Sequence, residues 1–306
     1  MLSGIDDEKR EYAQRLFLCL AVSIRPLHVE ELADILAIKF DLVAPPVFDA
    51  DWRPPDAEEA VLSACSSFIA VVEVDGTHVV QFAHFSVKEF LTSDRLSTSA
   101  ERLSYYHIDS MTAHTVLAHA SLSLLLQFDD KIDKVSVSHV PLALYAARHW
   151  ADHAQFGDVS SHIQDAMGRL FDPTQSHFAA WVWLYDIDHD WVEHMSGSNP
   201  TLPRAVPLYY ASLCGFRDLV EHLAIIRPPD VNAIGGAHKT PLHAATVKGH
   251  VGVARLLLSH SADPNSEGVG NWTPLHLASQ CGHLAIIGPL LENGADIEAL
   301  TDEEPM

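Results

Sequence analysis

The sequence has 306 residues, of which 48% are hydrophobic and 20% charged, so it can form the buried cores of two or three domains. Asp and Glu total 41 against 19 Lys and Arg, which gives a formal net charge of −22. A charge of this sign repels phosphate backbones and anionic membranes, and it argues against nucleic-acid binding.

The cysteines and the hydrophobic runs indicate where the protein resides. The four cysteines are far apart and form no C-x-x-C pair, as is typical of buried thiols in a reducing compartment. The first residues lack the apolar core of a signal peptide. No uncharged apolar run reaches the ~18–20 residues that span a bilayer. We therefore expect a cytoplasmic protein without a membrane segment.

Residues 5–95 are predicted to form a winged-helix domain, in which three helices precede a β-hairpin. Apolar residues recur at helical spacing in 7–24 and again from His28. Asp56 and Glu59 form a capping box at the start of the third helix. The sequences IAVVEV and THVVQF flank Asp75-Gly76, a strong hairpin signal. The first helix is expected to bury one stripe: Tyr12, Leu16, Phe17 and Leu20.

The stretch HFSVKEFL directly follows the hairpin and predicts a further helix. Ser86 and Glu89 have the spacing of a capping box, and Phe85 and Phe90 that of a hydrophobic staple. Helix initiation explains these four residues but leaves His84 without a role.

A DNA-binding winged helix would place its third helix against the groove. Here that helix reads DAEEAVLSACSSF, with three acidic residues and no Lys or Arg, so a phosphate backbone would repel it.

Three segments, RPLHVEELADIL, DAEEAVLSACSSFIAVV and VVQFAHFSVKEFLTS, resemble the winged-helix segment behind the NACHT nucleotide-binding domain of fungal NOD-like-receptor-type proteins. The resemblance covers about Ile5 to Asp94. In that family an ankyrin or WD40 array usually follows. The resemblance implies a hinge in a signalling receptor, a NACHT NTPase domain as a partner in cis or in trans, and a role in innate immunity or self/nonself recognition.

In related switch NTPases the histidine just after the wing contacts the β-phosphate of bound ADP, and His84 lies at the position that resembles it. Such a contact would bias a two-state hinge. The other interpretation is that His84 only hydrogen-bonds the wing to the following helix. No G-x-x-x-x-G-K-[ST] loop occurs in the sequence, so this chain alone is expected neither to bind nor to hydrolyse ATP or GTP.

Residues 96–195 are predicted to form a helical spacer domain, and residues 195–203 a hinge. Ser161 and Gln164 are predicted to form another capping box. His149 and His153 have a spacing that can chelate zinc, but no H-E-x-x-H motif or nearby cysteine supports a site. We expect these histidines to be solvated or hydrogen-bonded.

Three alternating acids, Asp186, Asp188 and Asp190, have the spacing of a calcium loop. Trp191 and Gly197 occupy the positions of the glycine and the glutamate that an EF-hand requires, so we exclude one. No metal and no cofactor is expected.

Residues 204–306 contain three copies of one pattern, clearest in KTPLHAATVKGHVGVARLLLSHSADPN and WTPLHLASQCGHLAIIGPLLENGADIE. The Pro-Leu step recurs at Pro207, Pro241 and Pro274, at intervals of 34 and 33 residues. This period with T-P-L-H is typical of ankyrin repeats. The segment resembles an ankyrin α-solenoid of about three repeats, and we expect the array to be truncated. In the first, worn copy Tyr209 replaces the histidine.

Each position of the motif has a mechanical role. Thr240 and Thr273 are expected N-caps of the first helix of a repeat, and His243 and His276 are expected to hold the turn to its neighbour rather than to bind metal. Glycines are expected where the helices reverse with positive φ, and Ser261 replaces one of them.

The predicted fold is therefore mostly α, and the predicted function is non-catalytic. There is no G-x-S-x-G elbow and no protease cysteine signature. The resemblance to ankyrin repeats implies that the hairpin tips and the inner-helix face bind proteins, because these parts leave the stacking contacts undisturbed. Trp272 is the best single candidate, because aromatic residues dominate binding hot spots; packing on the next hairpin is its other possible role. The predicted partner-binding residues are His238, Lys239, Asn271 and Trp272 at the tips and Val247, Lys248, Gln280 and Cys281 near the concave side.

Overall fold

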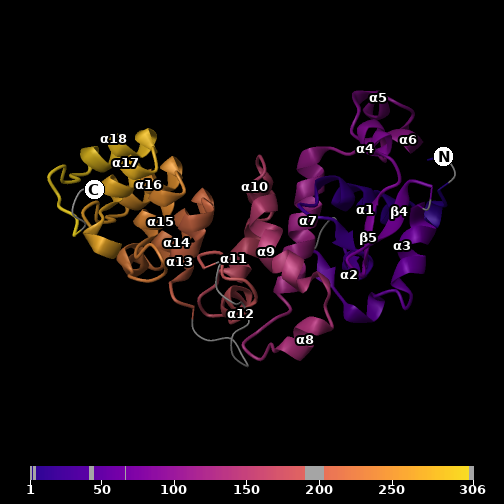
Figure 1. Cartoon of the computed structure of the whole chain (residues 1–306), viewed down its shortest axis with the longest axis horizontal. Helices are drawn as coiled ribbons and strands as arrows, with labels where there is room; N and C mark the ends of the chain where they lie inside the picture. Colours follow the sequence, from indigo (N-terminus) through magenta and orange to yellow (C-terminus); the bar gives the residue numbers. More distant parts are fainter. Residues whose placement is uncertain (1, 3–4, 41–44, 66, 190–202, 303–306) are drawn as a thin grey trace. The chain divides into compact units, whose positions relative to one another are not determined.

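The computed structural model describes residues 2, 5–40, 45–65, 67–189 and 203–302 (Figure 1). The described chain forms two compact units, one ending at Leu170 and one beginning at Phe171. The predicted hinge at 195–203 lies outside the described residues apart from Pro203, and so does Asp190.

The first unit begins with the predicted winged helix. Three helices precede a β-hairpin, and a short strand pairs with it in the order β1-β5-β4. Asp75 and Gly76 have φ of 49° and 77°, as the predicted hairpin turn requires. Asp56 caps α3 by accepting the N–H of Glu59 at 2.8 Å. The elements are α1 (Arg10–Val22), β1 (Leu27–His28), α2 (Val29–Leu36), β2 (Ile38–Lys39), β3 (Val47–Phe48), α3 (Ala57–Cys65), β4 (Ile69–Val74) and β5 (Thr77–Phe82), with 3₁₀ turns at Asp7–Lys9 and Ala50–Trp52.

Two local predictions in this domain are wrong. Tyr12 is 45% exposed, because the buried face of α1 runs instead through Leu16, Phe17 and Cys19. The helix after the hairpin begins one residue before Ser86, and His84 is its N-cap in place of Ser86. The imidazole accepts the backbone N–H that a capping hydroxyl would otherwise accept.

Further helices, α4 to α11, follow in the described part of the first unit. α7 packs against both α1 and α9, so the helices after residue 96 share contacts with the winged helix. The buried carboxylate of Asp34 on α2 accepts the N–H of Leu142 at 2.9 Å and thereby holds the start of α9. The helices are α4 (Phe85–Leu91), α5 (Asp94–Ser97), α6 (Glu101–Ser104), α7 (Ser110–Leu125), α8 (Lys134–Ser138), α9 (Leu142–Ala154), α10 (Val159–His162) and α11 (Gln164–Leu170).

The predicted capping box at Ser161 is wrong. Ser161 lies inside α10, and its hydroxyl donates to the carbonyl of Asp158 at 2.8 Å instead of accepting from the next helix. A serine in a helix often donates to a preceding carbonyl in this way.

The second unit contains the predicted repeats as three stacked helix pairs. The first helices α13, α15 and α17 form one row and the second helices α14, α16 and α18 the other, coloured orange to yellow in Figure 1. Helix α12 precedes the pairs in the same unit. The helices are α12 (His177–Leu184), α13 (Pro207–Cys214), α14 (Arg217–Ile226), α15 (Pro241–Val247), α16 (Val251–Ser259), α17 (Pro274–Gln280) and α18 (Leu284–Glu292), with 3₁₀ turns at Pro228–Asn232 and Val269–Asn271.

The predicted helix reversals are confirmed. Gly249 and Gly282 have φ of 77° and 73° just after the first helices. Ser261 takes the left-handed conformation with φ of 68°, at a cost of roughly 0.5–1 kcal/mol relative to glycine. The mostly helical fold, with a winged helix and ankyrin-like repeats, is as predicted.

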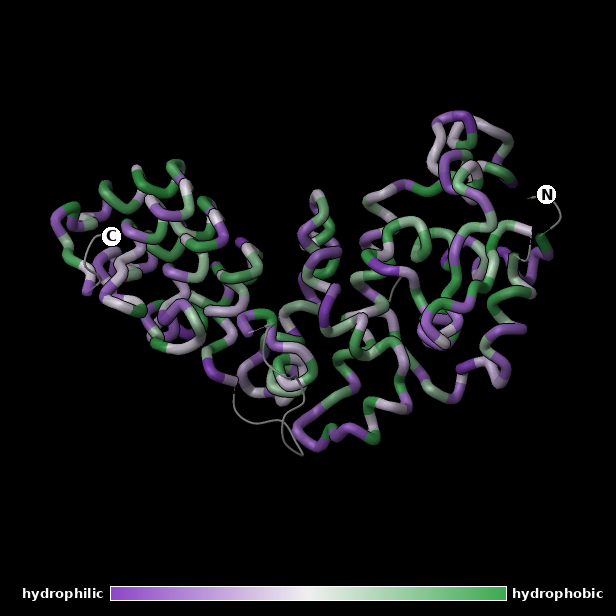
Figure 2. Tube along the Cα trace, in the orientation of Figure 1, coloured by the Kyte–Doolittle hydropathy of each residue, from purple (hydrophilic) through white to green (hydrophobic). Residues whose placement is uncertain are grey.

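Apolar residues are spread along the whole described chain, as the alternation of green and purple in Figure 2 shows. Among the described helices, none combines the length and the hydropathy that a bilayer crossing requires.

Candidate protein-interaction surface

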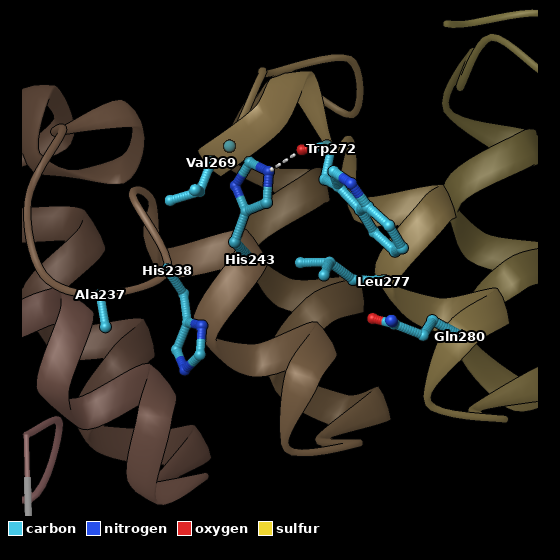
Figure 3. Close-up of a pocket in the computed structure, with 8 residues that line it drawn as sticks. Ala237, His238, His243, Val269, Trp272, Leu277 and Gln280 are labelled. Atoms are coloured by element: carbon cyan, nitrogen blue, oxygen red, sulfur yellow. Dashed lines mark hydrogen bonds between the residues drawn. The ribbon is translucent and has the colours of Figure 1, made fainter. Parts of the chain in front are cut away.

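A hollow of about 250 Å³ lies between the hairpin tips of the second and third repeats (Figure 3). In Figure 3 the His243 ring lies between the side chains of Val269 and Trp272, and His238 lies below them. The hollow brings together residues from both tips and from the end of α17. Its lining residues are Ala237, His238, His243, Gly268, Val269, Trp272, Leu277 and Gln280.

His243 is the fixed centre of this hollow. It is fully buried, and its Nε2 donates to the carbonyl oxygen of Trp272 at 3.0 Å. Its Nδ1 lies 2.8 Å from the hydroxyl of Thr240, which also caps α15. Burial lowers the pKa of His243, so the ring is neutral, with its proton on Nε2 and Nδ1 accepting from Thr240. The prediction that this histidine holds the next hairpin is confirmed.

A second pair of histidines, which the sequence interpretation missed, locks each repeat to the one before it. His250 Nε2 donates to the carbonyl of Leu213 at 3.1 Å, and His283 Nε2 donates to the carbonyl of Val247 at 3.0 Å. The signal was the Gly-His dipeptide at 249–250 and 282–283, which recurs with the repeat period.

Two asparagines make the corresponding links between the loops that follow the second helices. Asn232 donates to the carbonyl of Ser261 at 2.9 Å and accepts the N–H of Asp263 at 2.9 Å. Asn265 repeats both bonds, to Gly294 and Asp296, at 2.9 and 2.7 Å. These links hold the three repeats in register, so the hollow is a preformed feature.

A cluster of acids and tyrosines holds the first repeat. The hydroxyls of Tyr209 and Tyr210 donate to Asp188 at 2.7 Å and to Asp186 at 2.9 Å. Burial and the neighbouring carboxylates raise the pKa of both tyrosines, which keeps them protonated as donors. The D-x-D spacing that resembled a calcium loop therefore belongs to a hydrogen-bonded junction. The described residues contain no cluster of three or more metal-ligating side chains.

Three of the eight predicted partner-binding residues line the hollow: His238, Trp272 and Gln280. Trp272 is half-buried rather than exposed, and its ring centre lies 5.9 Å from that of His276. His238 is also half-buried, and burial is the first cause of its lowered pKa.

The other five are not among the residues that line the hollow. The side-chain amide of Asn271 donates to Asp302 at 2.8 Å, so it is engaged within the chain. Lys239 is a half-buried tip residue with φ of 75°. Half-buried Val247 ends α15, and exposed Lys248 and Cys281 are the C-caps of α15 and α17. The assignment of all eight residues to partner binding stays a prediction.

The weaker predicted site, His84, lies in the first unit. The residue is exposed, and its Nδ1 accepts the N–H of Ser86 at 3.2 Å and lies 2.7 Å from the Ser86 hydroxyl. Its ring centre is 4.3 Å from that of Phe85, which is 69% exposed, so the predicted hydrophobic staple is not buried. Capping of α4 therefore explains the hydrogen bond that Nδ1 of His84 accepts.

His149 and His153, considered above for zinc, are hydrogen-bonded. His149 Nδ1 lies 3.1 Å from the carboxylate of Asp152. Both ring nitrogens of buried His153 are engaged, Nε2 with the Tyr145 hydroxyl at 3.0 Å and Nδ1 with His114 Nδ1 at 2.8 Å.

Comparisons with known proteins agree with the winged helix and the ankyrin-like repeats described above. Residues 208–301 match the ankyrin-repeat family in three copies. Residues 1–101 match the family described as GPI inositol-deacylase, winged helix domain, which is NACHT-associated. The chain joins a winged-helix domain to ankyrin repeats.

One curated relative aligns with most of the chain. It is the azaphilone pigments biosynthesis cluster protein L of Monascus ruber, 28% identical over 278 residues. The alignment covers 86% of this chain and 58% of the relative, so the chain spans little more than half of the relative's length.

Proposed function

We propose that this chain is a non-catalytic interaction module, in which the ankyrin repeats bind a protein partner through the hollow between the second and third hairpin tips. The observation that supports this most is the convergence of His238, Trp272 and Gln280 on one preformed hollow. Ankyrin repeats generally bind proteins, and stacking leaves their tips and inner helices accessible.

Trp272 is the proposed anchor. Its backbone carbonyl is held by His243, so the position of the residue is fixed before a partner arrives. A rigid, half-buried aromatic side chain at the edge of a hollow has the properties of a binding hot spot. Preorganisation of this kind lowers the entropy that binding costs.

The test compares Trp272→Ala with Ile225→Ala in the full chain. Ile225 is 62% exposed on α14, away from the hollow, so it controls for the loss of an exposed apolar side chain. Proteins captured from the source cells by the wild-type chain should be bound at least about tenfold more weakly by Trp272→Ala, and equally by Ile225→Ala.

The thermal midpoint of Trp272→Ala should stay within about 2–4 °C of the wild type. A larger fall would make Trp272 a packing residue, and unchanged capture would remove the hollow from consideration as the binding surface.

The winged-helix part is proposed to be the hinge of a NACHT-type signalling receptor in the cytoplasm, with a role in innate immunity or self/nonself recognition. The match to a NACHT-associated winged-helix family supports this, and so does the order of a winged helix followed by ankyrin repeats. The NACHT domain would then be a partner in cis or in trans.

The alternative is an NTP-driven switch in which His84 senses nucleotide held by a NACHT domain. The exposure of His84 supports it, because Nε2 has no hydrogen-bond partner within the described residues. ADP affinity would be measured for the complex of this chain with a NACHT domain. His84→Gln should weaken it, and equal affinities would leave His84 as a helix cap only.

A further inference from the structure

The inner face of the repeats differs in charge from the rest of the chain. The hairpin tips and first helices lie in residues 203–216, 233–248 and 268–281, which contain three basic residues and no Asp or Glu. At the chain's average of 41 acidic residues in 306, these 44 residues would carry about six. All nine carboxylates of residues 203–302 are in the second helices and the loops beside them.

The basic residues divide in the same way between the two faces. Arg217, Arg227 and Arg255 are in or after the second helices, and each lies within 4 Å of a carboxylate. The three on the tips and first helices form no ion pair within the described part of the chain: Arg204, Lys239 and Lys248. The inner face therefore carries positive charge that the fold itself does not neutralise.

Three carboxylates close to the tips form no ion pair with these basic residues within the described part of the chain. The side chain of Asp188 is fully buried and receives the Tyr209 hydroxyl and the N–H of Ala237. Asp302 is held by Asn271, and Glu267 precedes the third tip. Burial lowers the pKa of His238; the Asp188 charge opposes this and the Lys248 charge adds to it, so the positive charge beside the hollow is that of the lysines.

The size and lining of the hollow limit what can enter it. About 250 Å³ is below the roughly 300–1,000 Å³ of pockets that take small-molecule ligands. The lining combines Val269, Leu277 and Trp272 with the polar tips of His238 and Gln280. This space suits one apolar side chain of a polypeptide.

We propose that the occupant is an acidic, extended segment of a partner protein. One apolar side chain of the segment enters the hollow, and carboxylates on either side of it meet Lys239 and Lys248. This inference rests on the proposed function and adds to it the chemistry of the partner. A nucleic acid would also meet the lysines, but the net charge of −22 would repel a long polyanion.

The test is a selection from a displayed library of random 12-residue peptides with the full chain as bait. Selected peptides should be enriched in Asp and Glu around an apolar residue. A synthetic peptide of the selected sequence should bind less tightly as salt rises and about tenfold more weakly to Lys239→Glu/Lys248→Glu at 0.15 M salt.

A matched control is Arg217→Glu/Arg255→Glu, which changes the net charge equally but on the second helices. It should leave the peptide affinity within about twofold. Lys239→Gly is a second variant of the site that keeps the fold, since glycine suits the φ of 75° at this tip, and it should lower the affinity as well.

The outcomes separate this inference from the proposed function. Peptides that require Trp272 but show no acidic enrichment would overturn the inference and leave the hollow as a binding surface. An equal loss of affinity in both double variants would also overturn the inference, because it would reflect net charge alone. Selected peptides that bind equally well to Trp272→Ala would contradict the proposed function. Failure to select any peptide would refute the extended-segment occupant.

Discussion

The hydroxyl of Tyr209 donates a hydrogen bond to Oδ1 of Asp188 at 2.7 Å and accepts the N–H of His238 at 3.1 Å. Asp188 also accepts the N–H of Ala237 at 2.6 Å. One buried carboxylate thus fixes the second hairpin tip, which lines the hollow, to the segment that precedes the repeats. Tyr209 performs for the first repeat the task that His243 performs for the second, namely holding the hairpin that follows.

Removal of the Tyr209 hydroxyl is expected to loosen this junction. Tyr209→Phe leaves the buried carboxylate of Asp188 with one donor fewer and should destabilise the second unit by about 1.5–3 kcal/mol. Tyr210→Phe is the matched control, because its acceptor Asp186 retains 17% exposure and water can replace the lost donor. Hydrogen–deuterium exchange of α13 and of the 236–239 tip measures both effects.

A larger effect of Tyr210→Phe than of Tyr209→Phe would contradict this assignment. It would mean that Asp186 rather than Asp188 carries the junction.

The periodic part of the fold could be predicted from the sequence, and the aperiodic part could not. Thr240 and His243 act within one turn of each other and recur with the repeat, so their roles follow from spacing. Asp188 meets partners 21 and 49 residues away that no spacing rule connects. The same limit applies to His84, whose capping role depends on where α4 begins.

The positions of the candidate binding residues follow from the repeat pattern, but the surroundings of their side chains do not. The repeat geometry indicates which residues occupy the tips, but not whether their side chains are available. Asn271 was a reasonable candidate by position, yet its amide is engaged by Asp302, 31 residues further along. Trp272 occupies a tip by position, yet it is half-buried, with its ring centre 5.9 Å from that of His276.

His243 and His276 occupy equivalent positions and are expected to differ in their contribution to stability. His243→Ala leaves the buried carbonyl of Trp272 without its donor and the hydroxyl of Thr240 without its imidazole acceptor, at a cost of about 2–3 kcal/mol. His276 is only half-buried and bonds Thr273 alone among the described residues, so His276→Ala should cost about 1 kcal/mol or less. Urea unfolding followed by far-UV circular dichroism would measure both, and equal costs would contradict the proposed link between repeats.

Gly249 and Gly282 provide a second matched pair. Their φ values of 77° and 73° impose the same strain on an alanine, about 1 kcal/mol. A Cβ at Gly249 would also lie 2.8 Å from the ring of His283, whereas a Cβ at Gly282 meets nothing within 4 Å. Gly249→Ala should therefore cost about 1–3 kcal/mol more than Gly282→Ala in the same urea unfolding measurement. Similar costs would show that the His283 ring moves aside freely.

The buried ring of His153 is expected to make the stability of the first unit depend on pH. Burial, followed by the charge of His114, lowers the pKa of His153 to about 4 from an ordinary 6.5. The unfolded chain therefore binds more protons than the folded chain between these two values, and stability falls as the pH drops from about 6.5 towards 4. Between pH 7 and pH 5 the contribution of His153 to this loss is about 2 kcal/mol.

His153→Gln removes the titrating group and keeps a polar side chain between Tyr145 and His114. The variant is expected to be less stable than the wild type at pH 7, because the packing around a fully buried ring is lost. Its loss of stability between pH 7 and pH 5 should nevertheless be about 2 kcal/mol smaller, because no buried imidazole then has to be protonated on unfolding. Urea unfolding at several pH values compares the two slopes, and parallel curves would show that His153 is not the group responsible.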